Sequence, residues 1–247
     1  MTKMCSGFLF VICAFVGALA ATTDEKQWIR DEHGCSAYNP TPQPKTGESI
    51  RWSGPCNQGY AEGRGRLEWF DASGNSDGWA EGTFEHGYLQ GFGESLGPKG
   101  SHYRGEFRYS RKNGRGKLDT PLGIQYEGLF RDGQPEGFGT TVWPDGMRYE
   151  GEYRNGKRDG HGVFIGPSGL RVEVNSMDGQ VEGRATVSGA DGTSYHIEVL
   201  NGVCVGLTDW HPAATELQKC KNHEGACKAE SIALANAIGC LPDSSSR

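Results

Sequence analysis

Apolar residues are scarce in this chain. Only 35% of its 247 residues are Ala, Val, Ile, Leu, Met, Phe, Trp, Tyr or Cys, whereas 39 residues are Gly, about twice the usual share. A large compact core is therefore not expected. The six Trp, nine Tyr and ten Phe argue against disorder, because disordered chains are poor in aromatic residues. The composition favours a folded, thin, glycine-rich architecture.

Patterns that would indicate an enzyme are weak. No histidine belongs to a His-Glu-x-x-His group, and residues 91–93 and 114–117, which resemble phosphate-binding loops, precede no helical pattern. Glu81, Glu127 and Glu150 lie beside aromatic residues and are typical of a solvated face. We therefore expect a non-enzymatic protein with no cofactor and no metal. The formal net charge of -6 also argues against general nucleic-acid binding.

The first twenty residues resemble a secretory signal peptide. Lys3 is followed by an apolar run of about 14 residues, and Ala18 and Ala20 are the small residues expected before a cleavage site. The alternative is an uncleaved membrane anchor, although spanning a bilayer usually takes about 20 apolar residues. We expect cleavage after Ala20 or Ala21 and a secreted or periplasmic protein.

Six cysteines remain after cleavage. An even number in an oxidising compartment favours disulfides over metal binding. We expect one bond between Cys35 and Cys56, which would tie the N-terminal arm to the first strand of a sheet, and pairing of the other four near the C-terminus. A zinc site around His223 is the alternative there. The six candidates are Cys35, Cys56, Cys204, Cys220, Cys227 and Cys240.

An internal repeat covers most of the chain. In the unit YEGEYRNGKRDGHG, glycines lie 2, 7, 11 and 13 residues after Tyr149, and the same offsets recur elsewhere. The last five intervals between units are each 23 residues, and the first interval is 28. Such a fixed period indicates a repeat architecture. The units begin at Trp52, Ala80, Tyr103, Tyr126, Tyr149, Val172 and Tyr195.

Each unit has the pattern of one β-hairpin. Tyr149, Gly151 and Tyr153 alternate along one face of a predicted strand. Asn-Gly or Asp-Gly follows at 132–133, 155–156 and 201–202, where glycine allows the positive φ of a tight turn. The alternating glycines leave gaps in which the aromatic ring of an adjacent hairpin could lie flat. We infer that rings and glycine sockets replace the second layer of an ordinary fold.

The units that begin at Tyr126 and Tyr149, YEGLFRDGQPEGFGTTVWPDG and YEGEYRNGKRDGHGVFIGPSG, resemble MORN (membrane occupation and recognition nexus) repeats. The pattern spans about residues 50–208. The resemblance implies an elongated, curved sheet of antiparallel hairpins, a role in protein scaffolding or localisation, and an association with phospholipids. Ala80, Ser110, Val174 and Ser176 depart from the pattern. Because the departures gather in the sixth unit, the last two hairpins are expected to form a cap.

The predicted fold is mainly β. About seven hairpins would form a single-layer antiparallel sheet of about 14 strands, on the order of 65 Å long. A signal peptide at 1–20 and an extended N-terminal arm at 21–50 precede the repeat array at 51–209. A disulfide-linked cap and tail follow at 210–247. Within that cap, residues 225–238 have the spacing of a helix that would cover the open edge of the last hairpin.

Two kinds of binding surface are predicted. A concave aromatic surface would hold a protein partner, because aromatic and Arg side chains often dominate interface energies; its residues would be Tyr103, Phe107, Tyr126, Phe130, Trp143, Tyr149 and Tyr153. The same rings could instead only hold the sheet together. Alternatively, the surface would bind a cell-envelope polysaccharide or an anionic phospholipid head group. Its basic patch would comprise Arg104, Arg108, Arg111, Lys112, Arg115 and Lys117.

The signal peptide is directly testable. Expression in a secreting host should give a mature protein that begins at Ala21 or Thr22, because cleavage follows small residues. Mass spectrometry of the culture medium or periplasm measures this. Full-length protein retained in the membrane fraction would contradict it.

Overall fold

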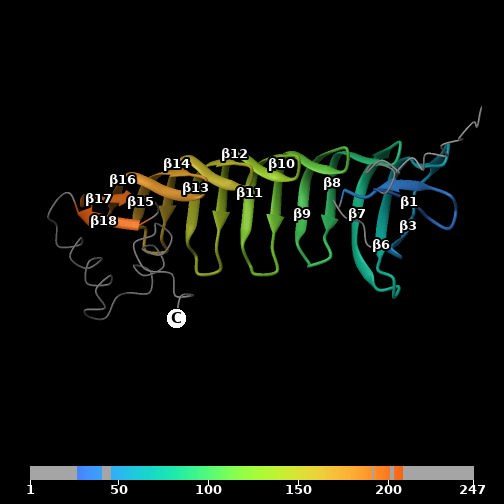
Figure 1. Ribbon diagram of the computed structural model, residues 1–247, viewed down its shortest axis with the longest axis horizontal. Helices are drawn as coiled ribbons and strands as arrows, with labels where there is room; N and C mark the ends of the chain where they lie inside the picture. Colours follow the sequence, from blue (N-terminus) through green and yellow to red (C-terminus); the bar gives the residue numbers. More distant parts are fainter. Residues whose placement is uncertain (1–26, 41–45, 191, 201–202, 208–247) are drawn as a thin grey trace, which may run out of the picture.

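The computed structural model describes residues 27–40, 46–190, 192–200 and 203–207. Its main feature is one antiparallel sheet of 14 strands, in the order β18 to β6 and then β3, laid side by side as a long ladder (Figure 1). The predicted fold class is confirmed. The strands of this sheet are β3 (Ser49–Trp52), β6 (Gly63–Phe70), β7 (Ser76–Glu85), β8 (Tyr88–Leu96), β9 (His102–Arg108), β10 (Arg111–Asp119), β11 (Gln125–Arg131), β12 (Gln134–Val142), β13 (Arg148–Arg154), β14 (Lys157–Ile165), β15 (Arg171–Met177), β16 (Gln180–Ser188), β17 (Ser194–Leu200) and β18 (Val203–Leu207).

Tight turns join the two strands of each repeat unit. Asp132 and Gly133 have φ of 49° and 90°, and Asn155 and Gly156 have φ of 49° and 80°. Two consecutive positive φ values are those of a type I′ turn, which matches the twist of the strands it joins. Tyr109 and Ser110 adopt the same conformation without a glycine, at 50° and 60°. The hairpin therefore persists in the unit that departs from the sequence pattern.

A row of glycines crosses the sheet at right angles to the strands. Each glycine faces another on the neighbouring strand, from Gly65 on β6 to Gly162 on β14. The row ends where Gly162 pairs with Val174. Its members are Gly65, Gly82, Gly93, Gly105, Gly116, Gly128, Gly139, Gly151 and Gly162.

Aromatic rings lie directly over this glycine row. A Cβ added to Gly151 or Gly162 would lie 2.5 Å or less from the Tyr149 hydroxyl oxygen, and Tyr126 covers Gly128 and Gly139 in the same way. The predicted sockets thus exist, but the source of the ring was predicted wrongly. Each ring comes from the same hairpin, two residues before the first glycine, because the side chain leans along its own strand.

The rings also contact one another across units. Tyr103 meets Phe107 of its own unit and Phe130 of the next, with centroids 5.1 and 5.0 Å apart and planes near perpendicular. Tyr126 meets Phe130 and Tyr153 in the same way, both at 5.1 Å. Edge-to-face pairs of this kind contribute about 0.5–1.5 kcal/mol beyond the area they bury. This zigzag of rings is the core of the single-layer sheet, on the side that we term the inner face.

Beyond β14 the core becomes more aliphatic, although the Tyr195 ring is also buried there. Val172 and Val174 are buried where the preceding unit has Tyr149 and Gly151. The last two units nevertheless continue the sheet in the same antiparallel order. The predicted helix at 225–238 and the four C-terminal cysteine predictions lie outside the residues whose side chains the structure describes, as does the signal peptide.

A second, small sheet combines two strands from the predicted extended arm with two strands from the segment between β3 and β6. Its order is β1-β2-β5-β4, formed by β1 (Trp28–Arg30), β2 (Ser36–Tyr38), β5 (Tyr60–Ala61) and β4 (Cys56–Asn57). The Trp28 ring contacts Tyr38 and Tyr60 of this sheet, and also Tyr88 of the array at 5.0 Å. These contacts dock the small sheet on the array, so strands this short are stabilised by packing rather than by length.

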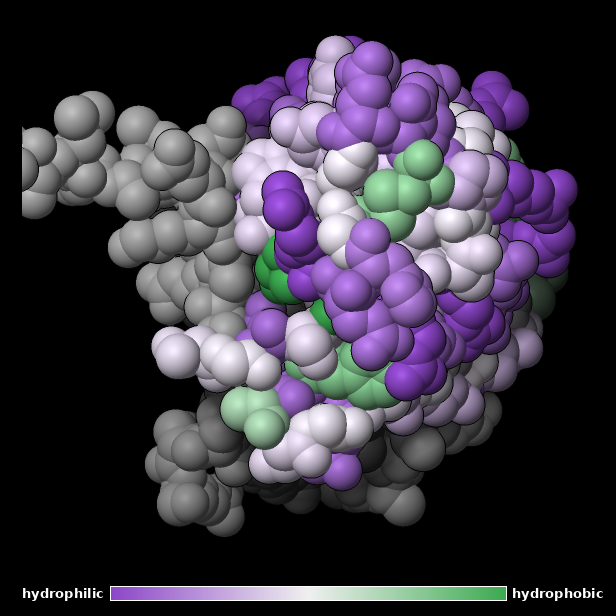
Figure 2. Space-filling model, turned by 90° about the vertical axis from the view of Figure 1, so that its right-hand side faces the viewer, coloured by the Kyte–Doolittle hydropathy of each residue, from purple (hydrophilic) through white to green (hydrophobic). Residues whose placement is uncertain are grey.

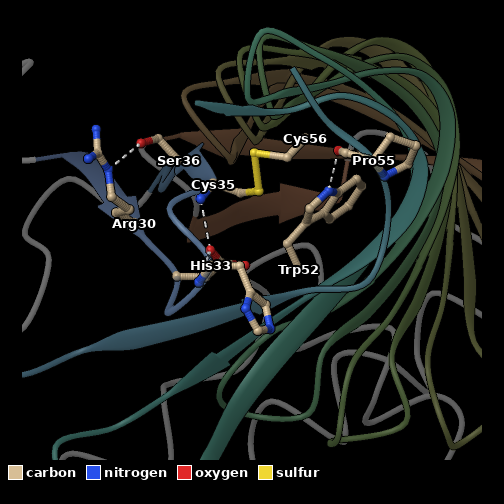
Figure 3. Close-up of a disulfide and its surroundings, with 8 residues drawn as sticks. Arg30, His33, Cys35, Ser36, Trp52, Pro55 and Cys56 are labelled. Carbon is tan, nitrogen blue, oxygen red and sulfur yellow. Dashed lines mark hydrogen bonds between the residues drawn. A yellow bond between two sulfur atoms is a disulfide. The ribbon is translucent and has the colours of Figure 1, made fainter. Parts of the chain in front are cut away.

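The Cys35–Cys56 disulfide is present (Figure 3). It joins the start of β2 to β4, both within the small sheet, rather than an arm to the first strand of the array. Beside it, the Trp52 Nε1–H donates to the Pro55 carbonyl oxygen over 2.7 Å (Figure 3). The disulfide therefore links the segment between β3 and β6 to the chain just before β2.

The β3 end of the array shows a mainly hydrophilic surface, with apolar residues visible only in small separate patches (Figure 2). Monomeric proteins commonly expose patches of this kind. Nothing in this view of the end resembles an apolar stacking face. Within the described ranges, no helix is long and apolar enough to cross a membrane.

Gly128→Val tests the contact between ring and glycine. The added Cβ would lie 2.6 Å from the Tyr126 hydroxyl oxygen and 2.7 Å from the Gly139 Cα, and neither neighbour can move without displacing the facing strand. We expect a loss of about 2–3 kcal/mol in the free energy of unfolding, measured by urea denaturation. Gly97→Ala is the matched control, because its nearest neighbour would be 3.7 Å away. Equal stability of the two variants would refute the contact.

Candidate binding surface

The predicted aromatic surface is not a surface. Six of its seven residues are at most 8% exposed, and Tyr103 and Tyr149 are fully buried. Trp143 is half-buried and packs against the core, beside Phe164. These rings therefore form no open aromatic face, and partner contacts at them stay a prediction. The edge-to-face packing hides the rings from solvent, as the structural alternative had allowed.

Two of the buried tyrosines, Tyr103 and Tyr126, satisfy their hydroxyls inside the core. The Tyr103 hydroxyl donates to the Glu106 carbonyl oxygen and the Tyr126 hydroxyl to the Leu129 carbonyl oxygen, both over 3.0 Å. Burial raises the pKa of both phenols well above the ordinary value, and raises the pKa of Tyr149 to about 12. These hydroxyls are structural groups that remain neutral at physiological pH.

The predicted basic patch is divided between the two faces. Lys112 lies on the inner face, with its Nζ 5.1 Å from the centroid of the Tyr103 ring, and burial lowers the pKa of its ammonium group. Arg108 and Arg111 face each other beside the β9–β10 turn. Arg104, Arg115 and Lys117 lie on the opposite, outer face. The six cations therefore do not form one site.

A shallow hollow of about 850 Å³ lies on the outer face, across β8 to β13. Four backbone glycines, Gly105, Gly116, Gly128 and Gly139, contribute to its lining. Three apolar side chains stand beside them and are freely exposed: Phe92 at 64%, Phe138 at 63% and Leu129 at 42%. Because these apolar side chains gather in one hollow, the hollow is a candidate binding surface.

The repeat explains why these rings point outward. Phe92 and Phe138 occupy the middle position of Gly-x-Gly, whose glycines belong to the inner face, so strand alternation places x on the outer face. Arg115 occupies the same position between them and pairs with Leu129 on the next strand. In the sequence, residues 91–93 resemble a phosphate-binding loop, and that resemblance obscured the outward position of Phe92. Applying the strand alternation to this position would have predicted the exposed ring.

Cations dominate the charge of the hollow. Arg104, Arg115, Lys117 and Arg148 line it together with one acid, Glu127. The Arg104 guanidinium lies 5.8 Å from the centroid of the Phe92 ring, a cation–π distance. Lys117 has a partner in Asp119 at 3.8 Å and Arg148 has one in Glu150, both in exposed pairs that are weak in water. The surface is therefore suited to anionic groups that carry apolar neighbours.

Catalytic geometry is not assembled at the two Gly-x-Ser-x-Gly matches, residues 74–78 and 93–97. Ser76 begins β7 and Ser95 lies within β8, so neither occupies the turn between a strand and a helix that a nucleophile elbow requires. No cluster of three or more His, Cys, Asp or Glu residues suited to a metal ion occurs among the described residues.

The fold and this surface define a single-layer β-repeat binding module. The MORN repeat model matches residues 81–102, 103–121, 126–148 and 149–171. The chain therefore contains four MORN repeats, as its sequence resemblance predicted. No curated protein sequence matches it.

Among solved structures, the chain is similar to the G-box domain of the microcephaly protein CPAP. The identity is 17%, the match covers 66% of this chain and 99% of that chain, and the TM-score is 0.21. A TM-score this low supports no argument about the fold or function of this chain.

Burial of the tyrosines predicts a loss of stability at alkaline pH. Because the folded pKa of Tyr149 is raised from 10.0 to about 12, its contribution is complete below about pH 10 and is lost as the pH rises through 12. Urea midpoints, measured with free thiols alkylated beforehand, should be level up to pH 10 and then fall. Tyr149→Phe should reduce the fall. A midpoint that stays constant to pH 12 in the unmodified sequence would contradict this.

Proposed function

We propose that this MORN-repeat protein is a non-catalytic scaffold that holds an acidic, extended segment of a partner protein across the outer hollow. The MORN repeat is generally a non-catalytic module that mediates interactions. The observation that carries the proposal is the combination of Phe92, Leu129 and Phe138, all exposed, with four cations around them. Aromatic and Arg side chains are the groups most enriched where interface energy is concentrated.

The geometry of the hollow suits an extended peptide. It crosses six strands, β8 to β13, and adjacent strands are about 4.8 Å apart, so its length is on the order of 25 Å. An extended chain of about eight residues spans that distance. Phe92 and Phe138 lie near its two ends, with Arg115 between them. Acidic residues in the middle of the segment and apolar residues toward its ends would match this order.

We further propose that the protein acts in an extracytoplasmic compartment. Support comes from the signal-peptide pattern of residues 1–20 and from the Cys35–Cys56 disulfide, since structural disulfides persist in oxidising compartments. An envelope polysaccharide or phospholipid head group is the other predicted ligand class. The exposed rings favour a protein, because a head group would engage the cations and leave Phe92 and Phe138 exposed.

Peptide display tests the proposal. A library of random peptides presented to the intact chain should enrich sequences that combine Asp or Glu with apolar residues. The double variant Phe92→Ala/Phe138→Ala should bind the selected peptides at least about tenfold more weakly, since each truncation removes an anchoring side chain. Leu122→Ala is the control, because Leu122 is 78% exposed in a loop outside the hollow.

The alternative ligand is tested in parallel with vesicles that contain anionic phospholipid. Peptide binding that survives the double variant, or vesicle binding without any peptide binding, would overturn the proposal. Rising salt should weaken peptide binding only in part, because apolar contacts persist when charges are screened.

A further inference from the structure

The zigzag of rings has one gap. In the units that begin at Tyr103 and Tyr126, the first ring contacts the second ring of its own unit and the second ring of the next. Trp52 of the first unit likewise meets Phe84, at 4.7 Å. The second unit begins with Ala80, so the ring that would join Phe84 to Phe107 is missing.

A cleft lies at this gap. Its volume is about 340 Å³, and it lies between the inner face of the array and residues 39–40 and 48 near the small sheet. Ala80, Phe84 and Phe107 all contribute to its lining. The two phenylalanines that lack a linking ring therefore meet the same space, which is on the opposite face from the outer hollow.

The chain fills this gap only in part. Leu89 is buried, and its Cδ1 would lie 2.7 Å from a Cβ on Gly82 and 3.3 Å from one on Gly93. Leu89 thus takes the place over the glycine pair that a tyrosine ring takes in later units. The branched end of the Leu89 side chain is smaller than a phenol ring and does not fill the same volume. The remaining space is the cleft.

The rim of the cleft is polar and carries both charges. Glu48 accepts a hydrogen bond from the Asn39 side-chain amide over 3.0 Å, and Asp77, Ser110 and Arg111 also contribute to the lining. An apolar floor below a rim of mixed charge suits a ring that is attached to polar groups. A peptide backbone has this character, since its amide groups both donate and accept hydrogen bonds. The volume is at the lower end of that of small-ligand sites, about 300–1,000 Å³.

We propose that the cleft binds a Tyr or Phe side chain from a peptide segment of a partner, whose ring occupies the space between Phe84 and Phe107 and completes the zigzag. The site is separate from the outer hollow and does not depend on the function proposed for it. The second unit, which departs from the repeat at Ala80, would then be the one that accepts a ring from outside the chain.

N-acetyl-tyrosinamide is the probe, with N-acetyl-alaninamide as the matched control and p-cresol as a free ring. The intact chain should bind the tyrosine probe, and NMR should show intermolecular NOEs from its ring to the ring protons of Phe84 and Phe107. The alanine probe should not bind. Because these measurements use the unmodified sequence, they test the site even where a variant fails to fold.

Ala80→Phe supplies the missing ring from the chain itself. We expect it to weaken binding of the tyrosine probe at least about tenfold and to raise the melting temperature. Ala190→Phe, which adds the same ring to an exposed loop, should leave binding unchanged. The proposal would be overturned if the unmodified chain did not bind the tyrosine probe up to roughly 10 mM, or if the Ala80→Phe variant bound that probe equally well. Binding of p-cresol without binding of the tyrosine probe would also overturn it.

Discussion

The architecture depends on a flat aromatic ring lying over two backbone glycines. Tyr126 covers Gly128 on its own strand and Gly139 on the next, and no side chain larger than hydrogen fits beneath it. A single-layer sheet has no second layer to bury its apolar face. The ring therefore supplies the second layer, while the glycines allow it to approach closely enough to exclude water. This contact accounts for a folded array in a chain with few aliphatic residues.

The same contact determines which face is available for binding. Once the rings and glycines occupy the inner face, every residue between them along a strand must point outward. The outer face therefore carries charged and polar side chains at many positions, and the exposed Phe92, Leu129 and Phe138 are apolar exceptions. The inner face opens into a cleft at Ala80, where the contact is incomplete. Both candidate sites result from the packing of rings over glycines on the inner face. The outer hollow forms where this packing directs other side chains outward, and the cleft forms where the packing is incomplete.

Much of this fold was predictable from the sequence because the repeat encodes local structure. The 23-residue period, the turns at Asn155 and Asp132 and the pairing of Cys35 with Cys56 are all confirmed. Strand alternation separates two faces, but it does not say which face is covered, so the burial of the rings could not be predicted from it. The small sheet escaped prediction because β1, β2, β4 and β5 are only two or three residues long. Their stability comes from contacts distant in sequence, such as Trp28 with Tyr88.

The reach of the ring contacts has a consequence for how such a chain can evolve. Tyr103 and Tyr126 each touch rings of their own hairpin and of the following hairpin, and of no more distant unit. Duplication or deletion of the 23-residue unit that begins at Tyr126 would therefore preserve the same kind of ring contact at the junctions beside it. A gene could lengthen or shorten this protein in steps of one hairpin, and so change the spacing between bound partners without redesigning any contact.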